Sequence, residues 1–170
     1  MKQYCLFLAC KQILTQLSCP AEATTYNTMS AVKDNAAGIY VRGGLFPRGR
    51  KLATGEYSRK ALRVNFIFQT GKDKGSILDW EVFLDKFESE MPTYFNKAFN
   101  LPSTEIGYDS ENKFTTDTKD IVKGVTMMFV RTDPQSGMMN IGRSAQGLTR
   151  YSCDYVIEYS IGEYTITQSN

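Results

Sequence analysis

Histidine is absent from the 170-residue chain. This absence removes the usual general base of enzymes, the usual proton shuttle and the commonest side-chain ligand of metal ions. A phosphate-binding loop is also missing, because the glycine-rich tract 43–49 lacks the spacing of the Walker motif and its Lys-Ser/Thr ending. We therefore expect that the protein is not an enzyme and that it holds neither a cofactor nor a metal ion.

Cysteines are few, and long hydrophobic runs are missing. No C-x-x-C pair of the kind used by zinc sites and redox proteins occurs among Cys5, Cys10, Cys19 and Cys153. We expect these four side chains to be reduced and apolar. No stretch is long enough to span a membrane. Lys11 and Gln12 interrupt the first apolar run, which is therefore shorter than most export signals. We expect no membrane partner and no export.

Net charge is low as well. A formal charge of +2 gives no overall attraction to nucleic acid or to anionic lipid. The hydrophobic fraction, 42%, is close to the average of globular proteins, and 170 residues suit a single domain that spans residues 1–170. A domain of this size buries roughly 70% of the surface that its unfolded chain exposes.

Two segments show helical periodicity. Residues 1–17 place apolar side chains on one face, at Leu6, Cys10, Ile13, Leu14 and Leu17. A second helix is expected to begin at the capping residue Ser76, with a buried stripe made by Trp80, Phe83, Leu84, Phe87 and Met91. Pro92 predicts a kink or a restart, after which Tyr94, Phe95 and Phe99 continue the apolar face.

Period-two alternation predicts strands at 38–42, 62–68, 124–131 and 151–161, with a short fifth strand at 164–167. The tract 133–137 (DPQSG) is expected to end the third strand. Residues 21–37, 43–61 and 103–120 are expected to be loops. Because strands and helices do not alternate regularly, the sequence predicts an α+β fold. We expect a mainly antiparallel four- to five-stranded sheet, two helices packed on one face, and extended loops.

The predicted core joins the apolar face of the second strand, the second helix and the last long strand. Its members are Leu62, Val64, Phe66, Phe68, Trp80, Phe83, Leu84, Phe87, Tyr155 and Ile157.

Charge is unevenly distributed along the chain. Residues 42–63 contain seven basic residues and one acid, a net charge of +6, whereas residues 72–121 contain eleven acids and six lysines, a net charge of −5. Both segments fit a solvated surface. Apolar residues nevertheless alternate with the basic ones, which favours a surface that a partner covers. The candidate interface residues are Leu45, Phe46, Arg48, Arg50, Lys51 and Arg59.

An alternative function is a nucleic-acid-binding module. It would use the basic segment 42–63 and a stacking platform formed by Tyr151, Tyr155 and Tyr159 on the last long strand. Core packing or a subunit interface explains these tyrosines better, because tyrosine suits half-buried strand faces without any ligand.

Three tracts near the end of the chain carry a family resemblance: residues 141–147 (IGRSAQG), 150–152 (RYS) and 155–159 (YVIEY). With the upstream order of helix, strand, Gly- and Pro-containing loop, apolar strand and long helix, they resemble the tail-terminator and minor-capsid proteins of long-tailed bacteriophages. The chain differs from smaller members of that family by longer insertions at 21–37 and 103–120.

The resemblance implies a virion structural protein without a catalytic site or cofactor. Its subunits would form a ring, typically a hexamer, at the head-proximal end of the tail, after assembly in the host cytoplasm. Its implied partners are other copies of the chain, the tail tube protein and the head connector or neck protein. Genomic DNA would pass through the ring without specific binding. The ring would end tube polymerisation and join the tail to the head.

Overall fold

The computed structural model describes residues 2–25, 36–41, 46–51, 57–71, 74–94, 96–101, 104–108, 114–123, 125–143, 148–162 and 165–168. For the strand residues 46–51, 57–60, 104–108, 114–123 and 165–168 it gives the backbone path alone. The elements are α1 (Lys2–Gln16), β1 (Ala23–Thr25), β2 (Ala36–Val41), β3 (Phe46–Lys51), β4 (Tyr57–Gln69), α2 (Lys74–Glu90), the 3-10 helix η2 (Met91–Thr93), β5 (Lys97–Asn100), β6 (Thr104–Tyr108), β7 (Phe114–Lys123), β8 (Thr126–Arg143), β9 (Thr149–Ile161) and β10 (Thr165–Gln168).

The strands form two sheets. The larger one has the order β1-β2-β4-β9-β8-β5. Its seventh strand, β3, pairs with residues 57–61 of β4, beyond the part of β4 that β2 pairs with. Only the β1–β2 pair of this sheet is parallel. The smaller sheet has the order β10-β7-β6. The expected α+β class is confirmed, but the expected four to five strands are too few and the large sheet is mixed.

One face of the large sheet carries the core. Antiparallel register places Phe66 opposite Cys153 and Val64 opposite Tyr155, so the apolar residues of β4 and β9 share that face. The aromatic stripe of α2 packs on it, with ring centroids 5.1 Å apart for Phe66 and Phe87. All ten predicted core residues are buried: Leu62, Val64, Phe66, Phe68, Trp80, Phe83, Leu84, Phe87, Tyr155 and Ile157.

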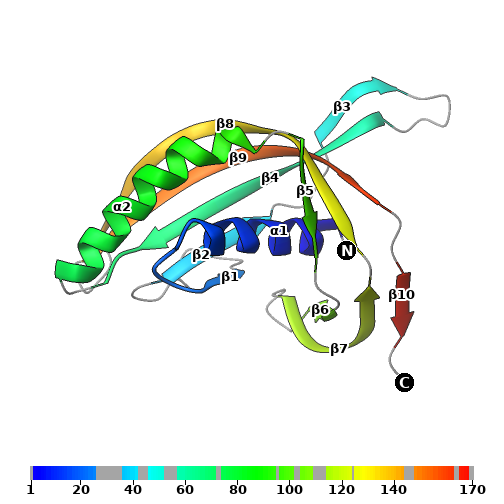
Figure 1. Ribbon diagram of the computed structural model, residues 1–170, viewed down its shortest axis with the longest axis horizontal. Coiled ribbons are helices and arrows are strands. Elements are labelled where there is room, and N and C mark those ends of the chain that lie inside the picture. The colour runs from blue at the N-terminus through cyan, green and yellow to red at the C-terminus, as the bar shows by residue number, and fades with distance from the viewer. Residues whose placement is uncertain are drawn as a thin grey trace.

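The first helix packs into the same core. Leu6, Cys10 and Ile13 are fully buried, as their helical spacing predicts, and they belong to one apolar cluster with the residues of α2 and the sheet. The Gln12 amide also donates a hydrogen bond to the carbonyl oxygen of Asn100 over 3.0 Å. Figure 1 shows the sheet curled over α1, with α2 alongside β8 and β9. Both helices therefore cover one face, as expected.

Three predicted loops contain strands. The segment 43–61 contains β3 and the start of β4, the segment 103–120 contributes to β6 and β7, and the segment 21–37 includes β1. These strands were missed because they are short, polar, or rich in Gly, Pro and charged residues, which are depleted in strands.

The predicted breaks at two prolines were only partly correct. Pro134 does not end β8, which continues to Arg143 with a register shift beside the proline. A proline is tolerated there because β5 pairs only with residues 126–129, so β8 has a strand on one side. At Pro92 the helix gives way to η2, and Phe99 then reaches the core from β5 instead of from a continued helix. Helix α2 also begins at Lys74, two residues before Ser76.

Candidate assembly surface

The predicted interface segment forms a β-hairpin, which we call the basic hairpin: residues 46–51 of β3 and residues 57–61 of β4. Its register pairs Phe46 with Ala61, Arg48 with Arg59 and Lys51 with Tyr57. Figure 1 shows this hairpin extending away from the rest of the large sheet. The prediction of an irregular loop is therefore wrong. A paired hairpin that projects from the sheet is better suited to contacting another molecule than an irregular loop is.

The fold brings most of the predicted interface residues together on that hairpin. Phe46, Arg48, Arg50 and Lys51 lie on β3 and Arg59 lies on the paired part of β4. Leu45 lies outside the described residues. In the backbone register, Arg48 and Arg59 are partners, so basic residues stand at paired positions on both strands of the hairpin.

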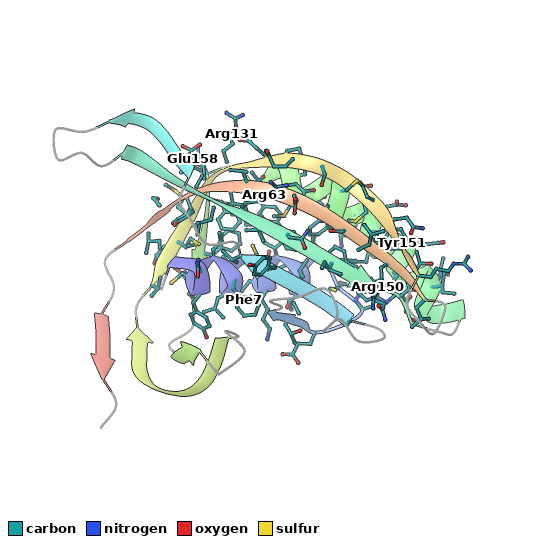
Figure 2. The ribbon with its side chains drawn as sticks, turned by 180° about the vertical axis from the view of Figure 1, so that it is seen from behind. Phe7, Arg63, Arg131, Arg150, Tyr151 and Glu158 are labelled. Atoms are coloured by element: carbon teal, nitrogen blue, oxygen red, sulfur yellow. The ribbon has the colours of Figure 1, made fainter. Side chains whose placement is uncertain are left out.

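The base of the basic hairpin is fixed to the sheet by an ion pair. Arg63 Nε donates to Asp154 Oδ2 over 3.1 Å, and Arg63 Nη2 contacts the same oxygen. Asn65 donates to Asp154 Oδ1 over 2.8 Å and to Ser152 Oγ over 2.9 Å. Figure 2 shows this side of the sheet, opposite the helices, with Arg63 labelled. These contacts fix the register of β4 on β9.

The same face continues towards both ends of the sheet. Arg150 Nε donates to Gln69 Oε1 over 2.6 Å, which ties the far end of β4 to β9. Near the hairpin, Glu158 is only 5% exposed and is the register partner of Ala61 on β4 and Arg131 on β8. The root of the hairpin is thus packed, and its direction is set by a rigid strand.

A second exposed feature lies on α2. We call Leu78, Glu81, Val82 and Asp85 the outer α2 surface, because positions i, i+3, i+4 and i+7 share one helix face. Leu78 is 60% exposed and Val82 is 61% exposed, although both are large and apolar. Glu81 and Asp85 are exposed beside them, and α2 as a whole carries five acids and two lysines. This surface was not predicted from the sequence, although two apolar residues four apart on the polar side of a helix indicate it.

The tyrosine platform of the alternative function is not available on β9. Tyr155 and Tyr159 are 4% and 3% exposed and belong to the core. Burial raises the pKa of the Tyr159 hydroxyl to about 12. Tyr151 is half-buried. Two of the three rings therefore cannot stack on a base without unfolding the sheet.

The cysteines show no sign of reactivity. All four are free, Cys5, Cys10 and Cys153 are buried, and burial raises the pKa of each thiol. Cys19 is half-buried, and burial raises its pKa to about 11. A nucleophilic cysteine needs a lowered pKa. Within the described ranges, no group of three or more Cys, Asp or Glu residues could hold a metal ion. No helix in the described part of the chain is long and apolar enough to cross a membrane.

No protein family model matches this sequence, and no curated protein matches it.

Proposed function

We propose that the protein is a structural subunit of a ring, hexameric by analogy, that caps the tail tube of a long-tailed phage at its head-proximal end. The ring ends tube polymerisation and joins the tail to the head connector. The subunit works in the virion after assembly in the host cytoplasm. It does no chemistry, and genomic DNA passes through the ring without specific recognition.

The basic hairpin is the observation that carries this proposal. A two-stranded ribbon with five basic residues and one acid between residues 46 and 61, whose outer part pairs with no other described strand, has little reason to project from a subunit that works alone. A projecting ribbon is a natural contact arm between subunits, and an exposed strand edge invites pairing with another chain. Of the tracts that carry the resemblance (141–147, 150–152 and 155–159), residues 141–143 end β8, and residues 150–152 and 155–159 lie on β9, which pairs antiparallel with β8.

Assembly can be tested directly with purified protein. Sedimentation velocity at low salt, over a range of concentrations, should reveal a species larger than a monomer. Electron microscopy of that species, or of the protein bound to isolated tail tubes, should show a ring. A chain that stays monomeric at every concentration and also fails to bind tail tubes is incompatible with the proposal.

The same basic hairpin makes nucleic-acid binding the competing explanation. Filter binding of single- and double-stranded DNA across a salt series separates the two. A phosphate-dominated binder loses affinity steeply as salt rises. We expect weak binding at low salt and none near physiological salt. Tight, salt-sensitive binding by a monomer would favour the nucleic-acid module.

A further inference from the structure

The basic hairpin and the outer α2 surface lie at opposite ends of the subunit. Strand β4 joins them: its first residues belong to the hairpin, and its last residue, Gln69, precedes α2 by a short connection. Thirteen residues of strand span about 40 Å. Figure 1 shows β3 and the start of α2 at the two extremes of the molecule. The outer α2 surface begins four residues into α2, and the hairpin extends in the direction away from α2, so the hairpin of a subunit does not contact its own outer α2 surface.

The two surfaces are complementary in charge. The segment 46–61, which contains the hairpin, has a net charge of +4, from five basic residues and one acid, and α2 has a net charge of −3, from five acids and two lysines. Complementary potentials across an interface set register and suppress wrong pairings.

The outer α2 surface also carries exposed apolar side chains, and the sequence of the basic hairpin includes an apolar residue. Leu78 and Val82 are exposed in the middle of the acidic helix face. Phe46 stands at the start of β3 within the basic hairpin. Burying apolar surface supplies the favourable free energy of association, while the surrounding charges supply specificity.

We infer that the basic hairpin of one subunit docks on the outer α2 surface of the next copy of this chain. This inference rests on the proposed ring and names its contact. The contact is head-to-tail, because two different surfaces of the same chain meet. Such a contact produces a closed ring when the rotation between neighbours divides a full turn evenly.

A charge-swap experiment tests the pairing. One variant reverses the hairpin (Arg48→Glu, Arg50→Glu, Lys51→Glu), and a second reverses the helix surface (Glu81→Lys, Asp85→Lys). Each variant alone brings like charges together at every contact, so association should weaken by more than about hundredfold. Glu22→Lys, an exposed reversal on the segment after α1, is the control and should assemble normally.

Mixing the two variants is the decisive measurement. The acidic hairpin of the first variant meets the basic helix of the second, and the basic hairpin of the second meets the acidic helix of the first. An equimolar mixture should therefore assemble again. Native mass spectrometry should find equal numbers of the two variants in each ring, because they must alternate.

An apolar variant tests the other half of the contact. Leu78→Ser with Val82→Ser should weaken association by at least about tenfold, through loss of buried apolar surface. Met139→Ser is the matched control, because Met139 is 51% exposed but lies on β8.

The outcomes separate the docking contact from the function. If the helix-reversed protein still forms rings, or if the mixture of variants stays dissociated, the docking contact is wrong while the ring survives. Helix-reversed rings that no longer bind tail tubes would assign α2 to the tube and overturn the contact too. Unmodified protein that neither self-associates nor binds tubes overturns both.

Discussion

Phe83 stands at the centre of the aromatic core. Its ring lies 5.2 Å from the ring of Phe68 and 5.7 Å from that of Trp80, centroid to centroid. Phe83→Ala removes these contacts and leaves a cavity, so we expect a loss of about 3–5 kcal/mol in the free energy of unfolding. Urea denaturation measures it. A loss below about 1 kcal/mol, the usual effect of a surface substitution, would place α2 outside the core.

Asp154 has a different kind of importance, because it accepts hydrogen bonds from two side chains of β4. Asp154→Ala leaves the partly buried side chains of Arg63 and Asn65 without this acceptor. We expect a loss of about 1–2 kcal/mol in the free energy of unfolding. Asp133→Ala is a matched control, since its partner Arg131 is largely exposed and such ion pairs contribute less than about 1 kcal/mol. Equal losses in the two variants would mean that the network around Asp154 has no special role.

Among the elements, the basic hairpin should be separable from the fold. Reversing Arg48, Arg50 and Lys51 to Glu should leave the melting temperature of the monomer nearly unchanged, because exposed charges contribute little to stability. Tail joining should nevertheless fail, since like charges would meet across the contact. In an infected cell we expect full heads separate from tails, with tails of uncontrolled length. Normal yields of joined particles would reduce the hairpin to solvated surface.

Elements with strong periodicity were predictable from the sequence. Helix α1, helix α2 and strand β9 follow their apolar spacing, and the ten predicted core residues are buried for the same reason. Strands that form mainly because a neighbouring strand pairs with them were not predictable from the sequence. Strand β3 contains Pro47 and Gly49 and exists because β4 extends far enough to pair with it. Strand β8 passes through Pro134 because β5 pairs only with residues 126–129, so no described strand needs the missing N–H of the proline on that edge.

The candidate surface was predicted in part. Clustered basic residues marked the segment that forms the hairpin, but periodicity gave no sign that it was paired. The outer α2 surface was missed because Leu78 and Val82 lie outside the buried stripe and exposed apolar residues are common when each is taken singly; the signal was their spacing of four. The backbone path places the hairpin at one end of β4 and α2 at the other. This separation is what suggests that the two surfaces meet between neighbouring copies of the chain.

For the whole molecule, we expect the free energy of unfolding to fall at alkaline pH. Burial raises the pKa of Cys5, Cys10, Cys153, Tyr155 and Tyr159 above the ordinary values of about 9 for cysteine and about 10 for tyrosine. As the pH rises, each of these groups therefore loses its proton at a lower pH in the unfolded chain than in the folded protein. The stability that they contribute is therefore complete below about pH 8.5 and falls above it.

Urea midpoints measured at pH 7, 8, 9 and 10 should show this decline. A Cys10→Ala, Cys153→Ala variant should show a smaller decline from pH 8 to pH 10, because two of the buried thiols are gone. A midpoint that stays constant up to pH 10 would contradict the raised pKa values.

The position of β9 also governs when the subunit can form during synthesis. This strand lies between β4 and β8 in the large sheet, yet it follows both of them in the chain. The core is incomplete until β9, which ends at residue 161, has left the ribosome. Helix α1 and strand β4 cannot reach their final packing before then. Pairing over such long sequence separations makes folding slow. In the ring that we propose, an incomplete nascent chain could therefore not take a place, and each subunit would join only after its central strand had been made.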